Sequence, residues 1–488
     1  MAYPSLLYYV KPKKKPMSLS VFEDLQLLNF IPKRVAKAAS VPCGRENISA
    51  RQELFKALSD GASVERYREL FDISCELHRL DKAFGEAGTE TEKCLIFFFI
   101  CERVRAFTLL AAESGLSDPM TKRFASAFVK SKESEQFIKM SGELDRLLPR
   151  AEETLTVSLE VSGQSVRVDS DISVTFMQRI RVCAETLGVS EPKVKNPENR
   201  GISPDILTSM GKLRVELMKE LKAFKSEFLS FYEPSIVYYR KEIEFYLTMV
   251  SLLQRIREVG IPLTYPTVAA GRVVNITEAY DVSLLAKNET DIVPNDISFT
   301  EEEPFYILTG ANGGGKTTYL RTVGIALVLF LLGCPLPCRS AAIGEVSNVF
   351  THFPRDERFD GSGRFVEENN RVQEILREMD GNSVVLLNET YSTTNEENAV
   401  KMTEKLANEL YGKRIFGLYI THQHGLSESE IPYLNVLIDV NDENRRTFKI
   451  AKQKSVGGSY ARDILIRCGL TVEALEARFG KLGEGENK

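Results

Sequence analysis

The stretch "FYILTGANGGGKTTYLRTVG", residues 305–324, joins an apolar strand-like run to a helix-like run through a loop that holds four glycines. The loop fits the pattern G-x-x-x-x-G-K-[ST], in which glycines let successive backbone N–H groups converge on phosphate oxygens. The N-terminus of the following helix adds its partial positive charge. The stretch therefore predicts a phosphate-binding loop at the end of a strand. Its expected contact residues are Gly310, Gly313, Gly314, Gly315, Lys316, Thr317 and Thr318.

Two side chains of the loop indicate which ligand it holds. Lys316 is placed to reach the β- and γ-phosphates of a nucleoside triphosphate, and the hydroxyl of Thr317 can bind Mg²⁺. ATP and Mg²⁺ are therefore the expected cofactors, and the expected activity is that of an ATPase.

A second apolar run, "SVVLLNET" at 383–390, predicts a buried strand that ends in a polar pair. Ligands bind at the carboxyl ends of strands in open α/β sheets. Most P-loop ATPases of this layout carry Asp-Glu here, where the aspartate helps to hold Mg²⁺ and the glutamate polarises the attacking water. In this chain Glu389 retains the glutamate that would act as the base, but Asn388 replaces the aspartate and offers Mg²⁺ only a neutral amide oxygen. We therefore expect slower hydrolysis or a weaker dependence on Mg²⁺.

A third strand-like run, "IFGLYITHQH" at 415–424, ends in Thr421 and His422. A polar residue that follows such a strand can reach the γ-phosphate. A single histidine is more often structural, but its place at the end of a third strand favours a functional role for His422.

The composition fits a soluble globular protein, with 43% hydrophobic and 27% charged residues. The net charge of −5 gives no general basic signal, so contact with nucleic acid would need a local patch. The longest apolar runs are too short to span a bilayer. Residues 1–16 predict a flexible basic N-terminal tail and lack the order of a secretory signal. Eight cysteines without an export signal favour reduced thiols in the cytoplasm. Cys334 and Cys338 form an isolated pair and predict no metal site.

Periodicity divides the rest of the chain into a helical part and an α/β part. Residues 17–262 predict a mainly α-helical domain with a small β-hairpin near 155–168. Apolar stripes over 207–231 and 243–253 predict two long consecutive helices, either a lever-like arm or part of a plain bundle. Residues 263–488 alternate strand-like and helix-like runs, which predicts a parallel sheet with helices on its faces.

Together these motifs resemble the MutS family of DNA mismatch-repair ATPases, which are ABC-type. Residues 309–338 are similar to the family's Walker A block, "FDGSGRFVEENNRVQEIL" at 359–376 to its signature region, and "SVGGSYARDILIRCGL" at 455–470 to a late segment of its head. The likeness is close over about 265–475, and fainter over 17–262. It implies an α/β P-loop (ABC-type) ATPase head preceded by a mainly α-helical core and lever domain.

The resemblance also assigns roles by position. Asn312 would help the loop to hold phosphates, and Ile292 and Asn295, in "IVPNDISF", would contact adenine. In the family, two heads dimerise and the signature loop of one subunit closes the nucleotide of the other. Ser362 and Gly363 would supply that loop here, although this chain has Ser-Gly-Arg-Phe where the family usually has Ser-Thr-Phe.

Two departures from the family pattern bear on function. Full mismatch sensors of the family carry an N-terminal domain whose Phe-x-Glu wedge stacks on the mispaired base, followed by a connector domain. The residues before the head of this chain resemble the core and lever instead, and the Phe-x-Glu match at Phe231–Glu233 ends a predicted lever helix. After Glu389 the family has Gly-Arg-Gly, whereas this chain has "TYS" at 390–392. We expect no wedge reading of mismatches, and altered coupling between the two nucleotide sites.

Two functions remain open. The first is an ATP-controlled cytoplasmic homodimer that binds duplex or branched DNA through its lever and core region, in mismatch repair, DNA damage or recombination-related processes. The alternative is an ATP-gated dimerisation or interaction protein with weak hydrolysis and no direct DNA reading. A transporter or chromosome-organising ABC ATPase fits less well, because no membrane partner is signalled and the arm is too short for a long coiled coil.

Overall fold

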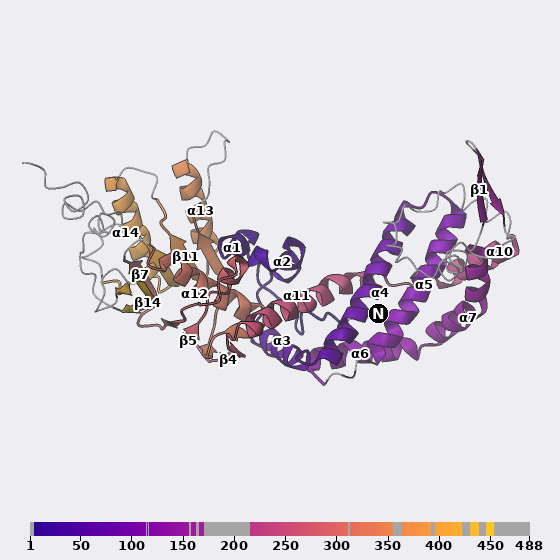
Figure 1. Cartoon of the computed structure of the whole chain (residues 1–488), viewed down its shortest axis with the longest axis horizontal. Helices are drawn as coiled ribbons and strands as arrows, with labels where there is room; N and C mark the ends of the chain where they lie inside the picture. Colours follow the sequence, from indigo (N-terminus) through magenta and orange to yellow (C-terminus); the bar gives the residue numbers. More distant parts are fainter. Residues whose placement is uncertain are drawn as a thin grey trace, which may run out of the picture. The chain divides into compact units, whose positions relative to one another are not determined.

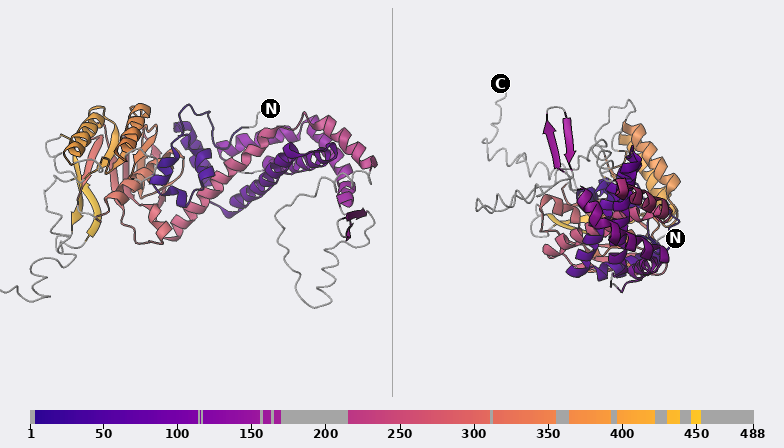
Figure 2. Two further views of the ribbon diagram at one scale, coloured as in Figure 1. Left: turned by 90° about the horizontal axis from the view of Figure 1, so that it is seen from above. Right: turned by 90° about the vertical axis from the view of Figure 1, so that its right-hand side faces the viewer.

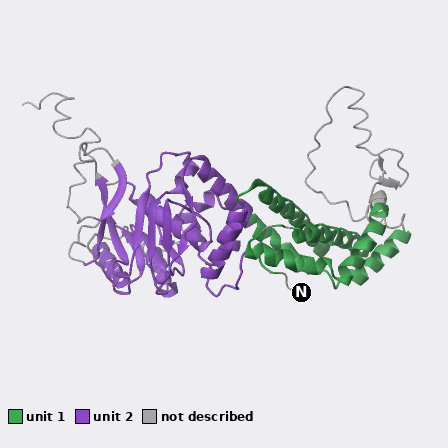
Figure 3. Ribbon diagram, turned by 90° about the horizontal axis from the view of Figure 1, so that it is seen from below, with its two compact units in different colours: residues 1–6, 59–244 green, residues 7–58, 245–488 purple. Residues whose placement is uncertain are grey.

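The computed structural model of the chain (Figure 1) describes residues 4–113, 115, 117–155, 158–162, 165–169, 215–310, 313–354, 364–391, 396–421, 430–438 and 446–452. The chain divides into two compact units, coloured separately in Figure 3. Unit 1 comprises residues 1–6 and 59–244, and unit 2 comprises residues 7–58 and 245–488. Among the described helices, none combines the length and the apolar character that a membrane crossing needs.

Unit 1 consists of long helices and one small hairpin. Its helices are α4 (Gly61–Glu86), α5 (Glu90–Ala112), α6 (Pro119–Lys132), α7 (Glu135–Leu155) and α10 (Val215–Phe228), followed by the 3-10 helix η2 (Pro234–Tyr238). Asp60, Thr89 and Asp118 cap α4, α5 and α6, because each side chain accepts a hydrogen bond from the first turn. Strands β1 (Ser158–Ser162) and β2 (Ser165–Asp169) pair antiparallel, at the place of the predicted hairpin.

The core of unit 1 is aromatic. Phe97 and Phe98 of α5 pack with Leu144 of α7 and with Leu221 and Phe224 of α10. The rings of Phe98 and Phe224 lie 5.4 Å apart, edge to face. The stripe predicted over 207–231 therefore buries its described members against α5 and α7, as an amphipathic helix does in a bundle. The second predicted helix is α11 (Tyr239–Glu258), which begins in unit 1 and continues in unit 2.

Unit 2 contains a six-stranded sheet in the order β10-β11-β12-β7-β13-β14. The first five strands of that order run parallel, and β14 pairs antiparallel with β13. The predicted parallel sheet is confirmed, with the three strand-like runs as β7, β11 and β12. The strands are β7 (Phe305–Thr309), β10 (Val349–His352), β11 (Val384–Asn388), β12 (Phe416–Ile420), β13 (Tyr433–Ile438) and β14 (Arg446–Lys452).

Helices cover both faces of this sheet, as the views in Figures 1 and 2 show. The helices α13 (Arg364–Glu378) and α14 (Glu396–Gly412) share a core with Val385 and Leu387 of β11. The intervening Leu386 points the other way and lies beside α12 (Lys316–Leu331), the helix that follows the glycine-rich loop. This alternation is the two-residue period of a strand that is buried on both faces.

Smaller strands surround the sheet in unit 2. Four of them form a second sheet in the order β4-β9-β5-β6, and β3 pairs with β8. Their bounds are β3 (Leu263–Thr264), β4 (Thr267–Val268), β5 (Val274–Ala279), β6 (Asn295–Phe299), β8 (Leu336–Pro337) and β9 (Ser340–Ile343), with the 3-10 helix η3 (Val282–Lys287) between β5 and β6.

Residues 7–58 lie in the unit that holds the sheet, although the sequence assigned them to the tail and to the helical domain. They form α1 (Leu19–Asp24), η1 (Leu27–Asn29), α2 (Lys33–Ala39) and α3 (Arg45–Ala57). Arg51 of α3 is fully buried and donates from Nη1 to the carbonyl of Leu332, at the C-terminus of α12, over 2.9 Å. In the predicted tail, Lys14 donates to the carbonyl of Val346 over 3.3 Å. Contacts of this kind, distant in sequence, place the segment in unit 2.

Candidate functional site

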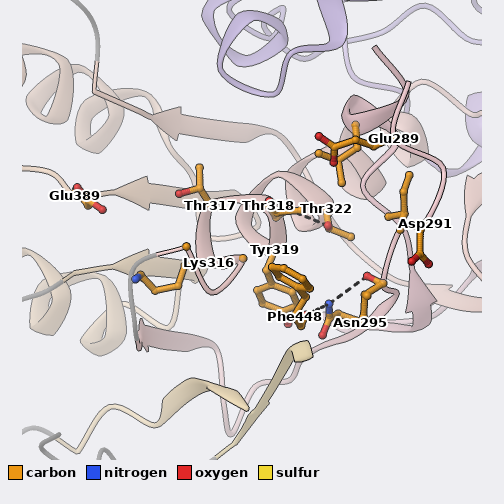
Figure 4. A pocket seen from close by; sticks show the side chains of 15 residues that line it. Glu289, Asp291, Asn295, Lys316, Thr317, Thr318, Tyr319, Thr322, Glu389 and Phe448 are labelled. Carbon is orange, nitrogen blue, oxygen red and sulfur yellow. Dashed lines mark hydrogen bonds between the residues drawn. The ribbon is translucent and has the colours of Figure 1, made fainter. Parts of the chain in front are cut away.

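A cavity of about 610 Å³ opens in unit 2 beside the glycine-rich loop and the N-terminus of α12. Its volume falls in the usual range for a pocket that takes a small ligand. Figure 4 shows Lys316 and Thr317 toward Glu389, with Glu289 and Asp291 on the other side of the cavity. The lining residues are Leu284, Glu289, Asp291, Ile292, Val293, Asn295, Gly313, Gly315, Lys316, Thr317, Thr318, Tyr319, Thr322, Glu389 and Phe448.

The glycine-rich loop has a backbone that glycine adopts readily and other residues do not. Gly310, Gly313 and Gly315 have φ angles of 130°, 73° and 92°. A Cβ atom on Gly310 would lie 2.9 Å from Cγ2 of Val436, so the loop also passes close to β13. Gly315 is the N-cap of α12. The first N–H groups of a helix have no partner within it, which makes this end suited to an anion.

The polar side chains of the loop lie at the cavity. Lys316 is only 6% exposed, and its Nζ donates to the carbonyl of Gly310 over 2.7 Å. This bond folds the lysine back across the loop. Thr317 and Thr318 also line the cavity, whereas Gly314 is buried and does not. Of the described residues that the sequence predicted for phosphate binding, Gly313, Gly315, Lys316, Thr317 and Thr318 line the cavity, and Gly310 and Gly314 do not.

The carboxyl end of β11 supplies the second half of the site. Asn388 is 7% exposed, and its Oδ1 has no hydrogen-bond partner among the described residues. A buried acceptor without a donor is costly, so this oxygen is suited to a ligand that brings a donor. Glu389, the next residue, lines the cavity, and its N–H donates to the carbonyl of Ile420 over 2.9 Å.

Glu389 and Tyr391 both have left-handed backbones, with φ angles of 49° and 67°. Such angles are uncommon outside glycine and persist where surrounding contacts fix them. Thr390, between the two, is buried and makes those contacts. Its Oγ1 lies 3.1 Å from Nδ1 of His352, and its carbonyl accepts from the hydroxyl of Tyr419 over 3.0 Å. The turn that carries Glu389 is thus held by buried hydrogen bonds on both sides.

The far end of the cavity contains the two residues that the resemblance assigned to adenine, Ile292 and Asn295. Asn295 uses both ends of its amide on the backbone of β14. Its Nδ2 donates to the carbonyl of Phe448 over 3.0 Å, and its Oδ1 accepts from the N–H of Ile450 over 2.8 Å. The side chain of Asn295 therefore links β6 to β14 through two hydrogen bonds.

Phe448 is a residue of this site that the sequence reasoning missed. It lines the cavity, is 45% exposed and has a φ angle of 56°. An exposed aromatic ring on a strained backbone at a cavity is a functional signal. Its strand, "RTFKIAK", carried no motif that could have indicated it. Tyr319 was also missed: burial raises its pKa, and its hydroxyl donates to the carbonyl of Asp296 over 2.8 Å.

Four predicted site residues lie outside the described part of the chain. They are Asn312, Ser362, Gly363 and His422. The loop residue Asn312, the signature-loop pair and the strand-end histidine therefore stay predictions.

Comparisons with known proteins found matches that include the glycine-rich loop. Residues 306–461 match the family model of MutS domain V. The chain is 34% identical over 157 residues to a DNA mismatch repair protein MutS from Fervidobacterium nodosum, which covers 31% of this chain and 19% of that protein. It is 28% identical over 301 residues to the protein of that name from Caldanaerobacter subterraneus subsp. tengcongensis, and the alignment covers 60% of this chain and 34% of that protein. It is 27% identical over 314 residues to the protein of that name from Petrotoga mobilis, where the alignment covers 62% of this chain and 35% of that protein.

The chain spans between about a fifth and a third of the length of these relatives. The domain V match covers part of β7, the whole of α12 and the strands that follow, and these elements supply one side of the cavity; the lining residues from Leu284 to Asn295 precede the match. The chain is therefore similar to the MutS family over that family's domain V, the ATPase region.

Proposed function

We propose that this chain is a MutS-family P-loop ATPase whose site is the cavity between the glycine-rich loop and Phe448. One observation carries the proposal. The helix N-terminus at Gly315, the ammonium group of Lys316 and the carboxylate of Glu389 meet at a single cavity. Phosphoryl transfer requires a group that binds the phosphates, a positive charge beside them and a base that activates the attacking water. The helix end, the lysine and the glutamate can supply these in turn.

The residues present fit Mg²⁺ as well as ATP. Thr317 offers a hydroxyl at the cavity, and Asn388 offers a buried oxygen that lacks a donor. An amide oxygen can accept from a metal-bound water, although without the attraction of a carboxylate. When bound near Thr317 and Asn388, Mg²⁺ would supply positive charge that neutralises the charge developing on the phosphates. Lys316 would move from the carbonyl of Gly310 to the phosphates, and Glu389 would orient and deprotonate the attacking water.

At the other end of the cavity, we assign the base of the nucleotide to Phe448 and Ile292. An exposed ring offers a stacking surface to a nucleobase, and Ile292 adds an apolar contact. Asn295 positions the ring through the backbone of β14 and need not touch the base itself. The carboxylates of Glu289 and Asp291 also line this end, where they can accept from ribose hydroxyls or base amino groups.

We further propose that two chains dimerise through their ATPase heads, and that the dimer binds duplex or branched DNA under ATP control. The names of the relatives support a role related to DNA mismatch repair. ATP would close the dimer, and hydrolysis would reset it. The predicted domain limits, 17–262 for the core and lever and 263–488 for the head, belong to the same proposal.

One observation favours the alternative, an ATP-gated interaction protein without DNA reading. Several basic side chains of α7 and α10 are paired with carboxylates and so do not form an uncompensated basic surface there. The pairs are Arg146 with Glu143 and Glu220, Arg150 with Glu220, Lys139 with Glu227, and Lys225 with Glu90.

The experiment that tests the proposal measures ATP binding and phosphate release by the purified chain, with and without mismatched, branched and plain duplex DNA. Lys316→Ala should weaken ATP binding about 10- to 150-fold, the effect of losing a charged hydrogen bond of about 1.5–3 kcal/mol. Glu389→Gln should keep ATP binding and dimerisation while turnover falls about 10²- to 10⁴-fold.

The outcomes separate the candidates. DNA-stimulated turnover, with DNA affinity that falls steeply as salt rises, supports the DNA-binding ATPase. ATP-dependent dimerisation without affinity for any of the DNA forms at low salt supports the interaction protein. Unchanged ATP affinity in Lys316→Ala would refute both.

A further inference from the structure

Asp24, the last residue of α1, lies among three elements of unit 2, one of which is the helix α12 that follows the glycine-rich loop. It is 9% exposed. Its Oδ2 accepts from the hydroxyl of Thr351 on β10 over 2.7 Å and lies 3.6 Å from Nη2 of Arg371 on α13. Its backbone carbonyl accepts from Nε of Arg321 on α12 over 3.4 Å. One residue of the N-terminal segment therefore contacts β10, α12 and α13.

The two arginines that meet Asp24 also meet at Phe353, which directly follows β10. Nη1 of Arg371 donates to the carbonyl of Phe353 over 3.2 Å. The guanidinium carbon of Arg321 lies 5.8 Å from the centre of the Phe353 ring, which is within cation–π range. Because β10 ends at His352 and α13 begins at Arg364, these contacts fix both flanks of the chain that contains the predicted signature loop.

Burial makes the charge of Asp24 important. The side chains of Arg371 and Asp24 are 20% and 5% exposed, so water screens their attraction less than it screens a surface pair. Burial lowers the pKa of Arg321, and the carboxylates of Asp281 and Asp24 raise it. A guanidinium stays charged under ordinary conditions, so removing the buried carboxylate of Asp24 removes part of the negative charge that compensates it.

The same segment presses directly on the helix of the phosphate-binding loop. A Cβ atom added to Gly324 of α12 would lie 2.4 Å from Cδ2 of Leu25, the residue after Asp24. Such close packing leaves little room for α1 to move without moving α12. α12 begins at Lys316, so Asp24 and Leu25 contact the helix whose first residue is proposed to hold the phosphates.

We propose that Asp24 is a positioning residue for ATP hydrolysis, which holds the end of β10 and the helix α13 in register with α12. This inference rests on the ATPase function proposed above, and it gives residues 7–58 a part in that reaction. Asp24 is not among the residues that line the cavity. Its expected effect is on the rate of hydrolysis and not on ATP affinity.

The test compares Asp24→Asn, Arg371→Gln and the double variant in the full chain, with Glu23→Gln as the matched control. Glu23 is the neighbouring residue of α1, and it makes an exposed pair with Lys33 at 3.0 Å. We expect Asp24→Asn to lower kcat about 2- to 30-fold, the effect of about 0.5–2 kcal/mol of lost coupling, with an unchanged dissociation constant for ATP. The control should keep the parental kcat. The double variant should be no slower than the slower single variant, because the two residues act as a pair.

Two further measurements keep the test decisive. Arg371→Lys retains the charge and should recover most of the kcat that Arg371→Gln loses, which tests the pair even where Asp24→Asn fails to fold. Hydrogen exchange of the α13 amides should be faster in Asp24→Asn than in Glu23→Gln without any nucleotide. Parental kcat in a folded Asp24→Asn, or independent effects in the double variant, would overturn the proposal. A parent chain that fails to bind ATP would instead refute the ATPase function, and the exchange comparison would still test the contact.

Discussion

Replacing Phe448 with alanine should weaken ATP binding while leaving phosphate binding intact. Phe448 is 45% exposed at the cavity, which for a ring of roughly 200 Å² leaves about 90 Å² for a nucleobase to cover. At about 25 cal/mol per Å², full coverage contributes about 2 kcal/mol. Measured base–aromatic stacking of about 1–3 kcal/mol agrees with this value. The dissociation constant for ATP should therefore rise about 5- to 30-fold.

The assay is a titration of the purified chain with ATP and, separately, with inorganic tripolyphosphate, which has no base. Phe448→Ala should lose affinity for ATP alone, and Phe448→Tyr, which keeps an aromatic face, should bind both as the parent does. Alanine also accepts the φ angle of 56° about as well as phenylalanine, so the fold should not change. Unaltered ATP affinity in Phe448→Ala would refute the stacking role. An equal loss for tripolyphosphate would show that the ring supports the loop beside Gly315 instead, since a Cβ atom there would lie 3.3 Å from Cδ1 of Phe448.

Two other substitutions test the metal side and the packing of the N-terminal segment. Asn388→Asp supplies the missing carboxylate and should lower the Mg²⁺ concentration for half-maximal turnover about tenfold, the equivalent of about 1.4 kcal/mol. Phosphate release measured across a series of Mg²⁺ concentrations tests this, and an unchanged Mg²⁺ requirement would contradict the assignment of Asn388. Gly324→Ala should destabilise unit 2 by about 1–3 kcal/mol because its methyl group overpacks against Leu25. Thermal unfolding should show a lowered midpoint, and adding Leu25→Ala to the same chain should restore part of it. No recovery would mean that α1 does not pack against α12 in solution.

The elements around the glycine-rich loop could be predicted because each carries a local signal. Each signal can be recognised within a window of about ten residues. The signals are a short apolar run for a buried strand, glycines directly before a helix-like run, and a polar pair after a second apolar run. The residues of β7, α12 and β11 therefore lie where the sequence indicated, and Lys316 and Glu389 reach the same cavity. The parallel order of these strands followed from their alternation with helices.

The parts that could not be predicted depend on contacts between distant segments. The helical periodicity of α1 to α3 shows that they bury one face, but it does not show against what. Their placement in unit 2 rests on contacts such as Leu25 with Gly324 and Thr351 with Asp24, which no local pattern encodes. Phe448 was missed for the same reason, because its position at the cavity is set by Asn295, about 150 residues earlier in the chain.

The geometry at the end of β11 bears on why the neutral Asn388 should slow hydrolysis without abolishing it. Glu389 is positioned through the backbone, by its own N–H on Ile420 and by the buried contacts of Thr390 with His352 and Tyr419. None of these bonds uses the side chain of Asn388. An asparagine in place of the usual aspartate therefore weakens the attraction for Mg²⁺ but leaves the base in its place.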